Sequence, residues 1–160
     1  MKKIAIIGAG ISGLFIANLF KKNSNYQISI YEKNNSINLD EGYGIQLSVN
    51  SVKLLNKIGF YKFKDEKKFN PDKINFYSIK STKKICDLDI SYFNSKDCKY
   101  TTLKRSDLIN FLNKDVKDLI KHSHSISQIE HENHKIKLTF ENRENSCLLY
   151  TSPSPRDGRI

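Results

Sequence analysis

Three glycines near the start of the chain constrain its fold more than any other feature. Gly8, Gly10 and Gly13 follow the apolar run Lys3–Ile7, which is typical of a short strand buried on both faces. The stretch Ile11–Phe20 has apolar residues at helical spacing and predicts a helix. In such a strand–turn–helix unit, Gly8 permits the sharp turn, Gly10 permits close approach of a pyrophosphate, and Gly13 permits close packing. The pattern predicts a dinucleotide-binding βαβ unit.

An acidic residue stands where such a unit would bind a ribose. Residues Gln27–Tyr31 predict a second strand, and Glu32 ends it at about the 20-residue distance expected beyond the last glycine. A carboxylate there can accept hydrogen bonds from the ribose hydroxyls of FAD or NAD and would repel the 2′-phosphate of NADP. The phosphates would lie at the positive end of the helix. The alternative is a tight turn without a ligand and with Glu32 at the surface.

The rest of the chain predicts more helices and strands. Helices are expected at Ser48–Ile58, with Gly59 as its stop, and at Arg105–Ile120. The apolar face of the second helix comprises Leu108, Leu112, Val116 and Leu119. Strands are expected at Ile74–Ile79, Lys84–Ile90, Ile126–Ile129 and Ile136–Phe140, with a turn around Asn133 between the last two. The predicted fold class is α/β: an incomplete Rossmann-like FAD/NAD(P)-binding domain, in which a βαβ unit with a parallel sheet is joined by a β-meander.

Composition limits the remaining classes of function. The 160 residues suffice for one ordinary domain, and the net charge of +10 comes mostly from scattered lysines. Without a groove-reading motif, that charge does not predict a nucleic-acid partner. No apolar run reaches the roughly 18 residues of a membrane span, so no transmembrane segment is expected. Cys86, Cys98 and Cys147 form no CxxC pair, which favours a reducing, cytoplasmic location over a disulfide framework or a zinc ribbon.

The four histidines could be read as metal ligands, because HxH and HxxH are ligand spacings. Strand parity would place His122 and His124 on one face and His131 and His134 on opposite faces. No acidic or cysteine partner completes a set, so the sequence favours polar histidines at strand edges and no metal.

A second group of motifs resembles a known family. The run Tyr31–Asn34 leads into Gly42–Leu47 and then Asn50. This resembles the single-component, para-hydroxybenzoate hydroxylase-like aromatic-ring monooxygenases, in which an acid and a loop precede GxGIxLxxN and a helix ending in glycine. Arg105, followed by Leu108 and Leu112, resembles the RxxLxxxL helix of that family, whose arginine reaches the FAD pyrophosphate region. The alternative for Arg105 is a solvated charge at a helix start.

The resemblance implies a cofactor, substrates and a set of binding residues. FAD would be the cofactor, with NAD(P)H as a transient co-substrate that needs no second glycine fingerprint. With O₂, the protein would hydroxylate a small aromatic substrate. The implied cofactor-binding residues are Gly8, Gly10, Ser12, Gly13, Glu32, Lys33, Gly44 and Arg105. The motifs name no catalytic residue, no particular substrate and no oligomeric state.

Other functions stay open for the same βαβ unit. Another FAD-dependent oxidoreductase, such as an amine oxidase or a disulfide reductase, would be expected to carry a GG-R element or a paired-cysteine motif after Glu32, and neither is present. An NAD-dependent dehydrogenase would not explain Gly42–Leu47 or Arg105. A non-catalytic dinucleotide-binding or interaction domain is the third alternative.

The domain prediction assigns residues 1–146 to the N-terminal part of an FAD-binding domain. Later motifs of the family are absent, so the resemblance implies an inactive fragment. Residues 147–160 change composition and hold two of the three prolines, Pro153 and Pro155. The stretch CLLYTSPSPRD resembles the translation of a transposase adapter used in sequencing libraries, and we expect residues 147–160 to be a non-native tail. The alternative is a genuine linker rich in proline and serine.

Overall fold

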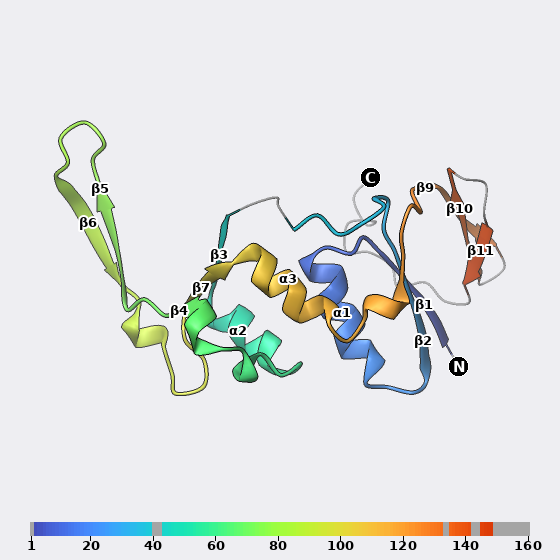
Figure 1. The fold of residues 1–160 in the computed structure, drawn as a ribbon, viewed down its shortest axis with the longest axis horizontal. Coiled ribbons are helices and arrows are strands. Elements are labelled where there is room, and N and C mark those ends of the chain that lie inside the picture. The colour runs from blue at the N-terminus through green and yellow to red at the C-terminus, as the bar shows by residue number, and fades with distance from the viewer. Residues whose placement is uncertain (1, 40–42, 133–134, 142–144, 149–160) are drawn as a thin grey trace. The chain divides into compact units, whose positions relative to one another are not determined.

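The computed structural model describes residues 2–39, 43–132, 135–141 and 145–148 (Figure 1). The chain divides into two compact units. Unit 1 comprises Met1–Asn38 and Leu112–Ile160, and unit 2 comprises Leu39–Phe111. In the ranges given above, no helix is long and apolar enough to cross a membrane.

Unit 1 begins with the predicted βαβ unit. Strand β1 (Lys2–Ile7), helix α1 (Ile11–Lys21) and strand β2 (Tyr26–Tyr31) follow one another, and the two strands pair in parallel from Lys2↔Tyr26 to Ile7↔Tyr31. The expectation that β1 is buried on both faces is wrong. Ile6 is buried, but Ile7 is 54% exposed, because the strand ends there at the rim of a cavity.

A third parallel strand completes this sheet, and the sequence did not predict it. Strand β8 (Ile120–Lys121) pairs with β2 through Ile30↔Ile120 and Tyr31↔Lys121, which gives the order β1-β2-β8. If β8 is counted as the third strand, this order corresponds to strands 3, 2 and 1 in one half of a doubly wound sheet.

The predicted helix Arg105–Ile120 is wrong in its second half. Helix α3 (Arg105–Asn113) ends early, and the 3₁₀ turn η4 (Lys117–Leu119) leads into β8. The carbonyl of Leu112, which Val116 would bond in a continuing α-helix, accepts instead from Asn18 Nδ2 at 2.7 Å. Val116 N donates to Asn113 O at 3.1 Å, so the chain turns although Leu112 and Val116 are buried as their spacing predicts.

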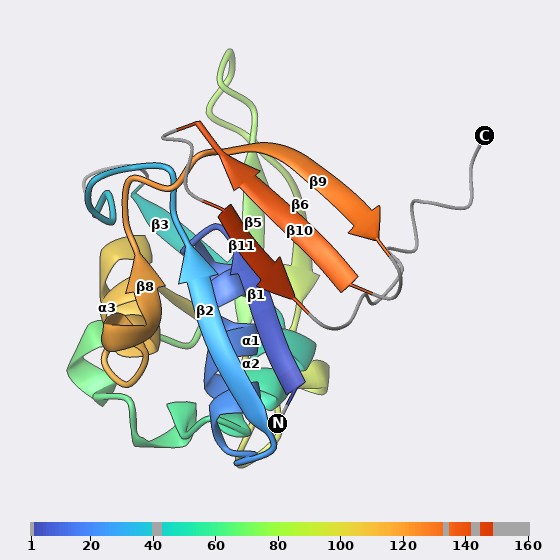
Figure 2. The same cartoon turned by 90° about the vertical axis from the view of Figure 1, so that its right-hand side faces the viewer.

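A β-meander covers the parallel sheet on the face opposite α1 (Figure 2). Strands β9 (Ile126–Glu132), β10 (Lys135–Phe140) and β11 (Asn145–Leu148) are antiparallel in the order β11-β10-β9. The alternation of β1 explains the two layers: Ile6 points toward Gly13 of α1, whereas Ala5 packs with Tyr31 and Phe140 beneath the meander.

The meander can be compared with the predicted strands and with the predicted domain boundary. The expected strands Ile126–Ile129 and Ile136–Phe140 are present, and the turn around Asn133 lies outside the described residues. Cys147 and Leu148 belong to β11, so the expected boundary after Ser146 falls within a strand. The non-native origin of residues 147–160 stays a prediction, and residues 149–160 are not described.

Unit 2 is built on a small antiparallel sheet. Strands β3 (Gly44–Leu47), β7 (Thr101–Lys104) and β4 (Lys68–Phe69) lie in the order β3-β7-β4. Helix α2 (Val49–Asn56) begins one residue after the predicted Ser48, which caps it, and ends two residues before the predicted Ile58. Gly59 follows with a left-handed φ of +93°. Two 3₁₀ turns, η1 (Phe60–Lys62) and η2 (Asp65–Lys67), lead to β4.

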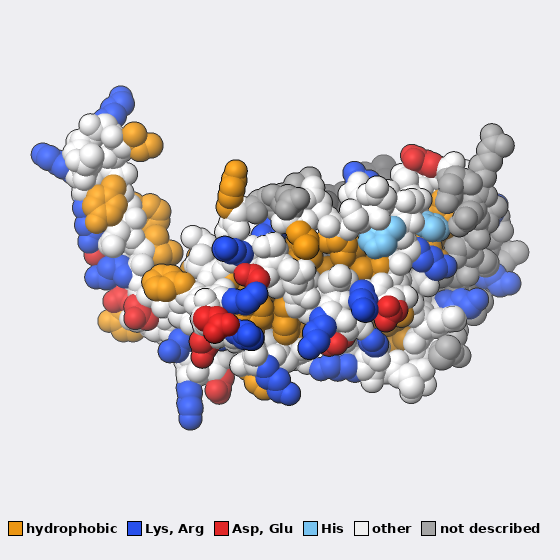
Figure 3. Space-filling view, in the orientation of Figure 1, with side chains coloured by type: hydrophobic (Ala, Val, Ile, Leu, Met, Phe, Trp, Pro, Cys, Tyr) orange, Lys and Arg blue, Asp and Glu red, His pale blue; other side chains and the backbone are white. Residues whose placement is uncertain are grey.

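A hairpin completes unit 2. Strands β5 (Lys73–Tyr77) and β6 (Lys84–Asp89) pair in antiparallel fashion close to the predicted limits, and the 3₁₀ turn η3 (Ser91–Phe93) follows. Hydrophobic side chains are exposed along this hairpin (Figure 3). They are Phe76, Tyr77, Ile79, Ile85 and Leu88.

Candidate functional site

The turn between β1 and α1 is built around two of the glycines. Gly8 has a φ of +92°, a left-handed conformation that favours glycine, and its N–H donates to Tyr31 O at 2.8 Å. Gly13 lies directly against this turn, because a Cβ at Gly13 would be 2.0 Å from Gly8 O. The sharp turn and the close helix–strand contact therefore depend on Gly8 and Gly13.

The N-terminal end of α1 is open. Gly10 is the cap residue and has no side chain to occupy the amides ahead of it, and a Cβ at Gly10 would meet no atom within 4 Å. The first helical hydrogen bond runs from Leu14 N to Gly10 O at 2.9 Å. The amides of Ile11, Ser12 and Gly13 therefore precede it, at the positive end of the helix. Open space beside unsatisfied N–H groups fits a phosphate.

Glu32 lies next to this turn and is fixed on several sides. Its Oε2 accepts from Ala9 N at 2.8 Å, and its Oε1 accepts from Asn34 N at 3.0 Å. Its main chain bonds the segment after β8, with Glu32 N donating to Lys121 O and His124 N donating to Glu32 O, both at 2.9 Å. The carboxylate thus has a defined position beside the glycine turn.

A cavity of about 290 Å³ opens where β1 and β2 end. Its apolar and aromatic lining includes Ile7, Tyr31 and Ile126, and the Glu32 carboxylate lies in the same wall. The remaining lining residues are Gly8, Lys33, His124 and Ser125. Apolar walls beside a few directional polar groups are typical of small-molecule sites.

The histidines do not lie as strand parity suggested. His122 and His124 precede β9, and Ser123 between them has a left-handed φ of +58°, so the expected shared strand face does not exist. His124 instead packs against Tyr31 and Phe140, with ring centroids 5.7 and 5.1 Å away. Its Nδ1 lies 2.6 Å from His122 O, and its contribution to the cavity had no signal in the sequence. His131 lies in β9, and His134 is outside the described residues.

We also searched the described residues for side chains that could bind a metal ion. Among the residues whose placement the structure gives, no three His, Cys, Asp or Glu side chains gather closely enough to hold a metal ion.

The other two predicted residues come together in unit 2. Gly44 opens β3 opposite Lys104, and Arg105 N donates to Tyr43 O at 3.3 Å. Arg105 is half-buried at the first position of α3. The predicted site residues therefore form two groups: Gly8, Gly10, Ser12, Gly13, Glu32 and Lys33 in unit 1, and Gly44 with Arg105 in unit 2. Gly42 of the same motif is not described.

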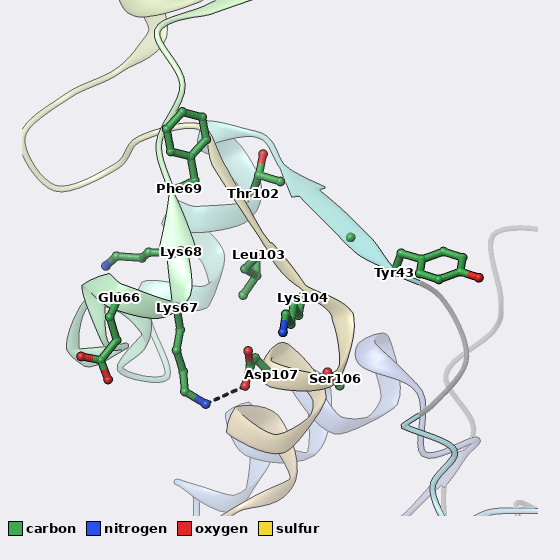
Figure 4. Close-up of a pocket in the computed structure, with 11 residues that line it drawn as sticks. Tyr43, Glu66, Lys67, Lys68, Phe69, Thr102, Leu103, Lys104, Ser106 and Asp107 are labelled. Atoms are coloured by element: carbon green, nitrogen blue, oxygen red, sulfur yellow. Dashed lines mark hydrogen bonds and ion pairs between the residues drawn. The ribbon is translucent and has the colours of Figure 1, made fainter.

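Unit 2 also has an open cavity of about 960 Å³ beside β4, β7 and the start of α3 (Figure 4). Lys67 Nζ pairs with Asp107 Oδ1 across it at 2.7 Å. Lys68 also lines the cavity, and its Nζ pairs with Asp65 Oδ1 at 2.9 Å. These lysines are thus already neutralised by acidic neighbours within the unit.

Comparisons with known proteins agree with this fold. Residues 6–39 match the family model described as an NAD(P)-binding Rossmann-like domain. The chain has a Rossmann-like fold. The matched residues contain the glycine turn, α1, β2 and Glu32.

Solved structures share the fold over most of the chain. A single-residue variant of HpxO from Klebsiella pneumoniae, complexed with FAD, is 17% identical with a TM-score of 0.78, covering 92% of this chain and 38% of that one. HpxO complexed with FAD and uric acid is 18% identical, with a TM-score of 0.75 and coverages of 92% and 37%. The 2,6-dihydroxypyridine-3-hydroxylase of Arthrobacter nicotinovorans is 14% identical, with a TM-score of 0.74 and coverages of 92% and 35%.

The chain spans 38% or less of the length of these three structures. A comparison with curated protein sequences gives no match. At these identities the likeness concerns the fold, which is α/β with a parallel βαβ sheet and antiparallel sheets, and which is partial relative to the solved structures.

Proposed function

We propose that this chain is the FAD-binding part of a flavoprotein monooxygenase. One observation carries the proposal: the open amides of α1 and the fixed carboxylate of Glu32 lie at the same end of the parallel sheet, beside a cavity. The fold is shared with HpxO, whose structure contains FAD, and with a hydroxylase of a pyridine.

Each part of the ADP half of FAD has a matching group in unit 1. The pyrophosphate would accept hydrogen bonds at the start of α1, where Gly10 leaves space and Ser12 is exposed. A carboxylate has about four acceptor positions, and Ala9 and Asn34 occupy two at Glu32, so two are left for ribose hydroxyls. The adenine would enter the cavity between Ile7 and Ile126.

Gly44, Lys33 and Arg105 complete the proposed cofactor-binding set. Lys33 is exposed beside Glu32 and supplies a positive charge for a phosphate. Arg105 begins α3 with a guanidinium group suited to bidentate phosphate binding, and Gly44 leaves the neighbouring strand β3 without a side chain. The resemblance of its helix motif, rather than its position, supports Arg105 as a phosphate contact.

The chemistry that FAD supplies when bound is acceptance of a hydride from NAD(P)H and activation of O₂ for hydroxylation of a small aromatic substrate. The described residues bind and orient the cofactor in this proposal. No residue of the chain is assigned a proton transfer or a contact with the substrate.

The family model over residues 6–39 also favours a second candidate, a domain that binds NAD without a flavin. The two candidates share the glycine turn and Glu32. They differ in the use of Gly44 and Arg105, which the NAD candidate leaves without a ligand.

Calorimetric titration of the 160-residue chain with FAD, ADP, FMN, NAD and NADP tests the proposal. We expect FAD and ADP to bind and FMN, which lacks the ADP half, not to bind. NADP should bind least among the dinucleotides, because Glu32 repels a 2′-phosphate. NAD binding tighter than FAD would favour the second candidate, and a chain that binds no adenine nucleotide would overturn both.

A further inference from the structure

The Glu32 carboxylate bonds the glycine turn itself. Its Oε2 accepts from the amide of Ala9 at 2.8 Å, and Ala9 is the residue between Gly8 and Gly10. Ala9 is 3% exposed and Glu32 is half-buried, so this hydrogen bond is partly buried. A bond from a charged acceptor to a buried amide is among the stronger kinds in proteins.

The carboxylate is held in place for this bond from its other side. Oε1 accepts from Asn34 N at 3.0 Å, and the main chain of Glu32 is bonded to Lys121 and His124. Ser123 N donates to Asn34 O at 3.0 Å, which ties the loop after β2 to the segment after β8. The acceptor that Ala9 uses therefore belongs to a fixed part of unit 1.

We infer that Glu32 is a positioning residue for the glycine turn, in addition to the ribose contact proposed above, on whose dinucleotide site this inference rests. Glycines on both sides of Ala9 give the turn much backbone freedom, which costs entropy when a ligand orders it. The bond to Glu32 restrains the middle of the turn, so the amides at the start of α1 are arranged before a pyrophosphate arrives.

For a ligand without ribose hydroxyls, the two roles of Glu32 predict opposite changes in affinity when the carboxylate is replaced. A carboxylate that only contacts ribose would repel the nearby phosphates of 2′,3′-dideoxy-ADP, so removing its charge should leave binding unchanged or tighten it. A carboxylate that also positions the turn should weaken binding of this ligand when its acceptors are removed.

Two neutral variants make the comparison. Glu32→Met removes both acceptor oxygens at similar length, whereas Glu32→Gln keeps one oxygen that Ala9 N can use. We expect Glu32→Met to bind 2′,3′-dideoxy-ADP about ten-fold more weakly than Glu32→Gln, the effect of one partly buried hydrogen bond to a neutral acceptor. Equal affinity in both variants, or tighter binding by Glu32→Met than by the unsubstituted chain, would overturn the inference.

Amide hydrogen exchange of the ligand-free 160-residue chain gives a readout that needs no nucleotide. In Glu32→Met, the Ala9 amide should exchange about ten-fold faster. The Gly8 amide, which donates to Tyr31 O, is the internal control and should keep its rate. An unchanged Ala9 rate counts against the inference.

The design separates failure of this inference from failure of the proposed function. If the unsubstituted chain binds neither ADP nor FAD, the proposed function fails, and the exchange of Ala9 still decides whether Glu32 restrains the turn. If Glu32→Met does not fold, as judged by circular dichroism, Glu32→Asp takes its place. The shorter side chain draws the carboxylate away from Ala9 while keeping the charge, and it should show the same faster exchange.

Discussion

A Cβ on Gly13 would lie 2.0 Å from the carbonyl oxygen of Gly8. The oxygen belongs to the backbone of a turn that is fixed by a hydrogen bond to Tyr31, so it cannot move away cheaply. We expect Gly13→Ala to destabilise unit 1 by about 1–3 kcal/mol, the usual cost of overpacking. Urea unfolding followed by circular dichroism measures the change, and a stability equal to that of the unsubstituted chain would contradict the packing role.

Gly10→Ala is the matched control for Gly13 and tests the pyrophosphate site. The added methyl group meets no protein atom within 4 Å, and the φ of −78° suits alanine, so the fold should persist with little loss of stability. The methyl group would occupy space through which a pyrophosphate approaches α1. We expect FAD affinity to fall at least about ten-fold, a loss of roughly 1.4 kcal/mol. Unchanged affinity in calorimetry would mean that FAD phosphates do not lie there.

Asn18→Leu tests why α3 ends at Asn113. The amide of Asn18 donates to Leu14 O at 2.8 Å and to Leu112 O at 2.7 Å. Its loss leaves the Leu112 carbonyl without this donor, and we expect unfolding free energy to fall by about 1–3 kcal/mol. Chemical denaturation measures this change. Ser24→Ala, at an exposed position of the same unit, is the control and should change the unfolding free energy by about zero. A cost as small as that of the control would show that Asn18 does not terminate the helix.

The hairpin of unit 2 carries a pH-dependent charge pair. A hydrogen bond from Lys84 and the charge of the same lysine, with a smaller contribution from Lys73, lower the pKa of Asp87. A lowered folded-state pKa contributes stability above the unfolded pKa, and that contribution disappears as the pH falls through the folded value. We expect Lys84→Gln to raise the pKa of Asp87, measured by NMR titration of its carboxyl carbon. An unchanged pKa would show that Lys84 does not hold the carboxylate in solution. Global stability should hardly change, because the pair is at the surface.

The start of unit 1 could be predicted because each of its signals is local. The strand, the glycines, the helix and Glu32 follow one another within a few tens of residues, and apolar periodicity sets their limits. The end of α3 could not be predicted. Val116 and Leu119 continue the helical spacing, whereas the carbonyl of Leu112 is taken by Asn18, a residue far away in the sequence.

Short strands were missed for a different reason. Strands β4 and β8 have two residues each, which is too few to show a periodic pattern. Strand β3 lies within Gly42–Leu47, a run that was noticed as a family motif and not as a strand. Within the site, the residue types could be predicted, but the bond from Ala9 to Glu32 could not. Neither spacing nor composition indicates which backbone amide a carboxylate accepts from.

The parallel sheet of unit 1 is assembled from two separate stretches of the chain, because unit 2 occupies the sequence between β2 and β8. During synthesis the glycine turn and Glu32 leave the ribosome well before Lys121, His124 and Ile126. The nascent chain can therefore form the βαβ unit early, but the far wall of the cavity is added only after the whole of unit 2 has emerged. If the chain binds a nucleotide as proposed, binding should accordingly be a late event in biogenesis, limited by the docking of a distant segment rather than by formation of the glycine turn.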